Sequence, residues 1–140
     1  MAVDFHRLLV PVAGTTADDE AMKLACRLSK KNRSKIWSVY VISVKRSLPL
    51  DAEIDSEIRA AEAVLDHIEQ VAEEQDHEVE TDILQAREAG PAIIDDAVER
   101  QVDLIIMGIQ YKTHFGQFSL GDAVPYVLKH AGCPVLLLRK

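Results

Sequence analysis

Short apolar runs alternate with longer amphipathic stretches along the whole chain. Five runs are too short for buried helices or are rich in β-branched and aromatic residues, and they predict strands. These strands are expected at residues 8–12, 35–44, 79–84, 104–107 and 135–138. Between them, apolar residues recur three and four positions apart, which predicts helices with one buried face. The helices are expected over residues 16–28, 54–72, 90–98 and 122–130.

Local signals refine two of these helices. Thr16 and Asp19 have the spacing of a capping box, which would begin the first helix at its amino end. In the third helix, the periodicity places Val98 on the inward face and the pair Asp95 and Asp96 on the solvated face.

Strict alternation of strands and helices defines the fold class. Parallel strands joined by right-handed crossover helices form a doubly wound α/β sheet with helices on both faces. A length of 140 residues suits one domain, and we expect residues 1–140 to form it. The strand order cannot be derived from this pattern.

Composition narrows the classes of function. Apolar and charged fractions of 48% and 28% are those of an ordinary globular protein. The formal net charge is -7, and residues 51–82 contain 13 acidic residues and one arginine. Such a face argues against nucleic-acid binding, which needs lysine and arginine at phosphates. No apolar run reaches the roughly 20 residues of a membrane helix, and no signal-peptide pattern is present, so a cytoplasmic protein without membrane insertion is expected.

Sequence signatures of catalysis are missing. The five histidines show no paired metal-ligand spacing, and the sequence has no GxSxG, GxxxxGK[ST] or GxGxxG motif. Cys26 and Cys133 also lack metal or redox spacing and are expected to be reduced packing residues. No nucleophile–base pair is found, so we expect neither a metal site nor catalytic residues.

The segment that begins at Asp103 carries a family resemblance. Its glycine pattern resembles the universal stress protein signature, which is Gly, two residues, Gly, nine residues, Gly, then Ser or Thr. Gly108 and Gly121 match the first and last glycines, whereas Tyr111 and Asp122 occupy the second glycine and the hydroxyl position. The ending HAGCPVLLLR, the start LLVPVAGT and the strand VYVISV are also similar to family segments.

This resemblance implies a strand order of 3-2-1-4-5 and an adenine nucleotide between the first and fourth strands. The ligand would be ATP or AMP, with Mg²⁺ only together with a nucleotide. The family's glycine loop wraps the phosphates, and residues after the first two strands hold the ribose and adenine. The matching site residues here are Pro11, Val12, Ala13, Gly14, Val41, Met107, Gly108, Tyr111, Gly116, Gly121 and Asp122.

Three departures from the family pattern predict a weakened nucleotide site. Ala13 stands where nucleotide-binding members carry Asp, and it cannot accept hydrogen bonds from a ribose. Tyr111 places a bulky side chain where glycine lets the backbone approach a phosphate. Asp122 would repel phosphate, although Asp is also a favoured helix N-cap. Lys112 and His114 partly restore positive potential in this loop.

Other functions stay open at this point. A second hypothesis is a dimeric interaction module that binds no nucleotide, and a third is a hydrolase of bound ATP. The loop YKTHFGQF is similar to universal stress domains attached to amino-acid transporters, which implies a transporter as a regulated partner. The last strand, from Val135 to Leu138, is apolar and would form a sheet edge in the implied order. Pairing with the same strand of a second copy would cover it, so we expect a homodimer.

Overall fold

The computed structural model describes residues 4–110, 113–114, 117–118 and 123–140. Strands and helices alternate along the chain as the hydrophobic pattern predicts. The main elements are β1 (Arg7–Val12), α1 (Thr16–Ser29), β2 (Lys35–Ser43), α2 (Asp55–Glu74), β3 (Glu80–Ala86), α3 (Ala89–Glu99), β4 (Leu104–Ile109), α4 (Ala123–His130) and β7 (Val135–Arg139). The sequence pattern did not predict β5 (Thr113–His114) and β6 (Gln117–Phe118), which pair as a small antiparallel ribbon.

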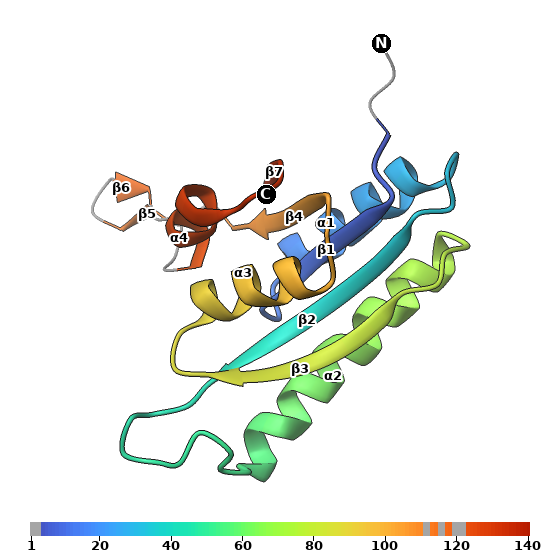
Figure 1. Cartoon of the computed structure of the whole chain (residues 1–140). Coiled ribbons are helices and arrows are strands. Elements are labelled where there is room, and N and C mark those ends of the chain that lie inside the picture. Colours follow the sequence, from blue (N-terminus) through green and yellow to red (C-terminus); the bar gives the residue numbers. More distant parts are fainter. Residues whose placement is uncertain (1–3, 111–112, 115–116, 119–122) are drawn as a thin grey trace.

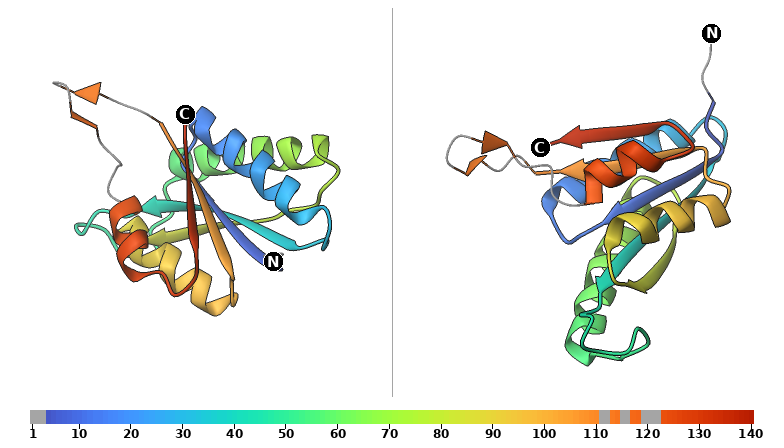
Figure 2. Two further views of the ribbon diagram at one scale, coloured as in Figure 1. Left: turned by 90° about the horizontal axis from the view of Figure 1, so that it is seen from above. Right: turned by 60° about the vertical axis from the view of Figure 1, so that its left-hand side comes forward.

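The five longer strands form one parallel sheet in the order β3-β2-β1-β4-β7. Helices α1 and α2 cover one face of this sheet, and α3 and α4 cover the other (Figures 1 and 2). Because β7 is the fifth strand of the sheet, this is the expected 3-2-1-4-5 order. The doubly wound α/β fold is therefore confirmed.

Side chains of the central strands alternate between two hydrophobic cores. Leu8 and Val10 pack with α1 and α2, whereas Leu9 packs with α3 and α4. In β4, Ile106 belongs to the first core and Ile105 to the second. Both faces of β1 and β4 are thus buried, which explains why their sequences are continuously apolar rather than alternating.

The helix α1 begins at Thr16 as expected, but its capping pair differs from the expectation by one residue. The helix begins after Thr15, and the Asp18 carboxylate accepts the N–H of Thr15 at 2.9 Å. The predicted pair was Thr16 and Asp19, which is wrong as a cap. Two adjacent Thr residues and two adjacent Asp residues give the same spacing in two registers, so the spacing alone could not choose between them.

Two expectations for α3 are also wrong. Val98 is 69% exposed rather than inward-facing. Asp96 is 7% exposed, whereas its neighbour Asp95 is exposed as expected. The reason is an ion pair: the Nε–H of Arg100 donates to Asp96 Oδ2 at 2.8 Å, and its Nη2 reaches Asp82 at 3.0 Å. A paired carboxylate can be buried at much lower cost than an isolated one.

Trp37, the chain's sole tryptophan, lies near the amino end of β2. It is 4% exposed, and its Nε1–H donates to Glu80 Oε2 at 2.9 Å. The charged groups of Arg7, Lys35 and Arg100 lie 4.7, 5.2 and 5.7 Å from its ring centroid. Its fluorescence should therefore report unfolding of this end of the sheet.

Candidate functional site

Strands β1 and β4 separate toward the carboxyl end of the sheet. β1 pairs with β2 as far as Val12, opposite Tyr40, but it pairs with β4 only at Leu8 and Leu9. Pro11 fits this divergence, because it has no N–H to donate to a neighbouring strand. The opening between the ends of β1 and β4, hereafter the crevice, is where ligands bind in open α/β sheets.

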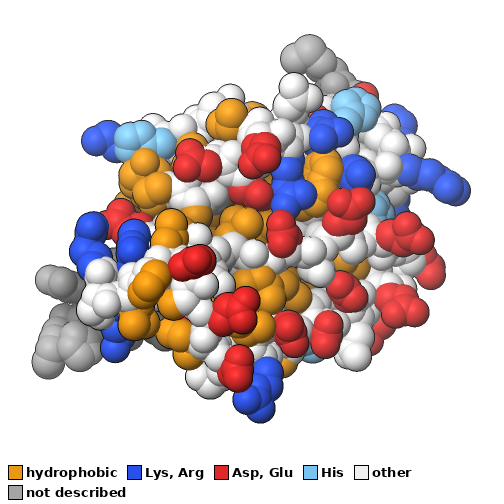
Figure 3. Space-filling model, turned by 60° about the horizontal axis from the view of Figure 1, so that its bottom comes forward, with side chains coloured by type: hydrophobic (Ala, Val, Ile, Leu, Met, Phe, Trp, Pro, Cys, Tyr) orange, Lys and Arg blue, Asp and Glu red, His pale blue; other side chains and the backbone are white. Residues whose placement is uncertain are grey.

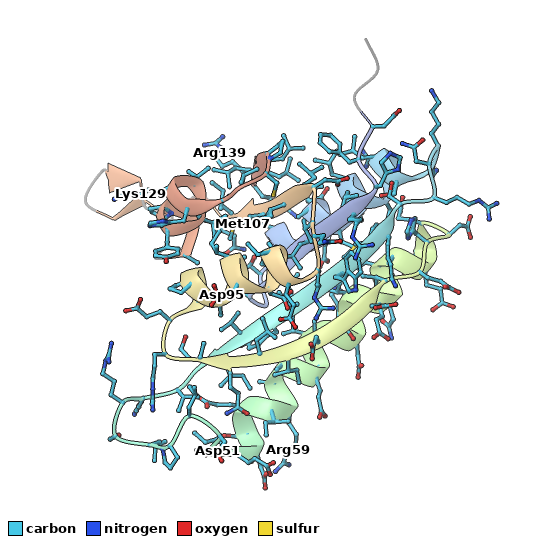
Figure 4. All side chains as sticks on the ribbon, in the orientation of Figure 1. Asp51, Arg59, Asp95, Met107, Lys129 and Arg139 are labelled. Carbon is cyan, nitrogen blue, oxygen red and sulfur yellow. The ribbon has the colours of Figure 1, made fainter. Side chains whose placement is uncertain are left out.

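Residues of the crevice come from three strands. Pro11 and Val12 are buried at the end of β1, and Met107, 7% exposed, packs with residues of α3 and α4 (Figure 4). Val41 is half-buried one residue beyond the last β2 residue that pairs with β1. Ala13 is exposed immediately after β1. Val12 packs in the core beneath α1 and α2 and Met107 in the core beneath α3 and α4, so the crevice lies between the two cores, with Ala13 exposed at its end.

The remaining predicted site residues divide into two groups. Gly14 and Gly108 lie in the described part of the chain, at the ends of β1 and β4. The other four lie outside the described residues, so their predicted roles stay predictions. These four are Tyr111, Gly116, Gly121 and Asp122.

A carboxylate that the site prediction did not include occupies the loop after β1. The Oδ2 atom of Asp18 accepts the backbone N–H groups of Ala13, Gly14 and Thr15 at 3.1, 2.7 and 2.9 Å. Gly14 has φ +91°, a left-handed conformation that glycine adopts without strain. Successive N–H groups that converge in this way form an anion-binding concavity, here filled by the chain's own side chain.

Asp18 is itself almost completely buried, with 3% of its surface exposed. Burial raises the pKa of its carboxyl group above the ordinary value, and the nearby Asp19 acts in the same direction. The three backbone N–H donors oppose this effect and lower the pKa, because they stabilise the charged form. Asp18 is therefore a structural carboxylate with little solvent around it.

The first turn of α1 is seated directly against the end of β4. A Cβ atom added to Gly108 would lie 2.1 Å from the carbonyl oxygen of Ala17. Nearby, the Nε2 of Gln110 donates to the Thr16 hydroxyl at 3.1 Å. Gly108 therefore has a packing function in this fold, whatever it does for a ligand. Gln110 and Thr16 join the two sides of the crevice.

A cavity of about 300 Å³ lies beside the crevice, between the start of α1 and α2. Its walls include Gly14, Asp18, Val64 and His67. The Nε2 of His67 lies 2.9 Å from Asp19 Oδ2, which connects the two helices at this cavity. Helix α2 lies close to the loop after β1, because a Cβ atom added to Gly14 would lie 3.3 Å from a methyl carbon of Val64.

A wider cavity of about 1110 Å³ lies at the opposite edge of the sheet, near the starts of β2 and β3. Its walls contain both basic residues, such as Lys30 and Arg33, and acidic residues, such as Glu73. Lys35 and Glu80, also in its wall, form an ion pair of 3.1 Å. This cavity contains none of the predicted site residues. Ligands of open α/β sheets bind at the carboxyl ends of the strands, so the crevice is the better candidate for the ligand site.

These contacts decide which part of a nucleotide the crevice fits. Val41, half-buried near the end of β2, offers apolar contact of the kind that a base needs, whereas Val12 and Met107 are buried in the two cores. The three N–H groups after β1 are bonded to Asp18, so this loop offers them to no phosphate. The described residues thus fit a base and sugar better than they fit a phosphate group.

Comparison with known proteins agrees with this architecture. A model of the universal stress protein family matches residues 4–139. The chain belongs to the universal stress protein family. A universal stress protein of Methanocaldococcus jannaschii is 30% identical over 142 residues, covering 97% of this chain and 83% of that protein.

Solved universal stress proteins share the fold at lower identity. One from Archaeoglobus fulgidus has a TM-score of 0.80 at 19% identity, with 94% of this chain and 97% of that chain covered. A structure from the same organism in complex with dAMP has a TM-score of 0.76 at 16% identity, with 96% and 98% covered. A family protein of Arabidopsis thaliana with AMP bound has a TM-score of 0.66 at 16% identity, with 96% and 92% covered.

Three further observations describe this universal stress protein. Acidic side chains are spread over much of the face shown in Figure 3, consistent with the acidic composition of residues 51–82. Within the described part of the chain, no helix has both the length and the apolar character needed to cross a bilayer. The same residues contain no group of three or more His, Cys, Asp or Glu placed to hold a metal ion.

Proposed function

We propose that this universal stress protein is a regulatory domain that binds an adenine nucleotide, ATP or AMP, in the crevice. The observation that carries the proposal is the early end of pairing between β1 and β4, which stops at Leu9 and Ile105, while β1 stays paired with β2 as far as Val12. The half-buried Val41 and the exposed Ala13 after the neighbouring strand end suit a base whose sugar points toward solvent. Mg²⁺ would enter only together with a nucleotide.

Nucleotide-bound relatives support this proposal. Solved family structures that resemble this fold contain dAMP, cAMP or AMP. We expect weak binding, micromolar or weaker, for two reasons. The side chain of Ala13 supplies no acceptor for the ribose, and the N–H groups that follow β1 already bind Asp18.

Calorimetry with purified protein tests the nucleotide proposal. AMP and ATP should each bind at one site per chain. Ala13→Tyr should abolish binding, because the new ring would fill the mouth of the crevice at an exposed position. Ala60→Tyr is a matched control at an exposed position of α2 and should leave binding unchanged. If neither nucleotide binds at millimolar concentration, the proposed function is wrong.

We also propose a homodimer through β7. This strand is an edge of the sheet, and Leu136 is 40% exposed on it. An apolar edge strand presents unpaired backbone groups, which antiparallel pairing with a second copy would satisfy. Leu137 packs into the core beneath α3 and α4, so a substitution there would disturb folding as well as association.

Light scattering after chromatography tests the dimer. At micromolar concentration the protein should have twice the chain mass of 15.6 kDa. Leu136→Lys should shift the protein to monomer, whereas Leu128→Lys, which alters a residue 48% exposed on α4, should not. A wild-type monomer throughout this range would refute the interface. The regulated transporter and the cytoplasmic location remain predictions from sequence.

A further inference from the structure

We propose that Asp18 gives the crevice a preference for ligands with little negative charge, so that adenosine and AMP bind more tightly than ATP. This inference rests on the proposed adenine-nucleotide function and specifies which member of that class the site accepts. It assigns a specificity role to a residue outside the glycine loop.

The first step of the argument is the geometry of the β1–α1 loop. Three consecutive N–H groups, of Ala13, Gly14 and Thr15, converge on one oxygen of Asp18. A left-handed Gly14 allows this convergence. In a concavity of this type, a bound anion normally satisfies such donors. Here the donors are already satisfied, so a phosphate would have to displace a carboxylate that the chain itself supplies.

The second step concerns charge. A helix N-terminus attracts anions through a partial charge of about +0.5, and this attraction falls off within the first turn. Asp18 and Asp19 lie in the first turn of α1, where their charges exceed and reverse that potential. Asp19 lies against His67 and is partly neutralised when that histidine is protonated. Asp18 is bonded to backbone N–H groups, whose dipoles offset only part of its charge, so a net negative charge remains beside the crevice.

The third step is the low screening of Asp18. Solvent-exposed charges are screened by water and salt, but Asp18 is only 3% exposed. At an effective dielectric constant between protein and water, one charge about 10 Å away changes affinity by about two- to fivefold per unit of ligand charge. An AMP phosphate carries about -2 at neutral pH, and each further phosphate adds to this penalty.

The predicted signature is a dependence on ligand charge rather than a general loss of affinity. Asp18→Asn keeps a side-chain oxygen that can accept the three N–H groups, but it removes the charge. Adenosine binding should therefore change by less than about twofold. The affinity for AMP should rise by several fold, and those for ADP and ATP by still larger factors.

The experiment is isothermal calorimetry of adenosine, AMP, ADP and ATP without Mg²⁺, which would neutralise phosphates. Wild-type protein should bind ADP and ATP more weakly than AMP, and Asp18→Asn should reduce this difference. Asp95→Asn removes an exposed acid of α3 and should leave the series as in wild type. If Asp18→Asn does not fold, Asp18→Ser, which retains one acceptor, takes its place.

Each outcome decides between explanations. Wild-type protein that binds ATP at least as tightly as AMP overturns the inference but leaves the nucleotide function standing. An equal gain for all four ligands in Asp18→Asn would mean that Asp18 acts on the shape of the loop, and this also overturns the inference. If none of the four compounds binds either protein, the proposed function itself fails.

Discussion

Replacing Gly108 by Ala tests the contact that holds α1 against β4. The added Cβ would lie 2.1 Å from the carbonyl oxygen of Ala17 and 2.5 Å from its carbonyl carbon. Both are backbone atoms at the start of a helix, so no side-chain rotation can relieve the overlap. Overpacking a core costs about 1–3 kcal/mol. Since the helix itself must move here, we expect a loss near the upper limit, about 3 kcal/mol.

Urea unfolding followed by Trp37 fluorescence measures this loss. Gly132→Ala is the matched control, because no atom lies within 4 Å of its added Cβ. Gly132 is not among the described residues with positive φ, so alanine should leave stability unchanged or raise it by about 0.4–1 kcal/mol. If Gly108→Ala is as stable as Gly132→Ala, the close seating of α1 is wrong.

Three further outcomes are expected. Ile105→Ala, at a fully buried core position, should cost about 2–5 kcal/mol in urea unfolding, and a loss below about 0.5 kcal/mol would contradict its placement. Because the pKa of Asp18 is raised above 3.8, the folded state binds a proton that the unfolded state has released, so this group's contribution to stability falls as pH rises through that window. Asp18→Asn should remove this fall in unfolding curves measured from pH 4 to neutrality; an unchanged pH dependence would contradict the shift. Arg87 Nη1 donates to the carbonyls of Lys45 and Leu48 at 2.6 and 2.9 Å, so Arg87→Met should speed tryptic cleavage after Lys45 on gels, and equal rates would refute this role.

The sequence pattern predicted the long strands and helices and the fold class, because each of these elements has its own local signal. The run around Leu9 and the run around Ile105 are apolar at every position, and this marks strands buried on both faces. The order of the strands came only from the family resemblance. Periodicity describes each element separately and contains no information about which strands are neighbours.

The candidate site was less predictable, because its contacts connect distant segments. Gly108 was expected to approach a phosphate, and no local pattern reveals that Ala17 lies against it. Asp18 was missed because Asp19 fits the capping spacing from Thr16 equally well. The burial of Asp96 had a local signal, an arginine four residues later, but a pattern of apolar residues contains no information about ion pairs.

The hydrogen bond between Gln110 and Thr16 joins residues 94 positions apart. At the amino ends of β1 and β4, the Asp103 carboxylate accepts the backbone N–H of Arg7 at 3.0 Å, and these two residues are 96 positions apart. Contacts of such high sequence separation form slowly, and a ribosome delivers the second partner long after the first. The crevice therefore cannot form until the segment around Gln110 has joined the segment around Thr16. A compound that binds there recognises only completed chains, so its saturation would count correctly folded molecules in a preparation.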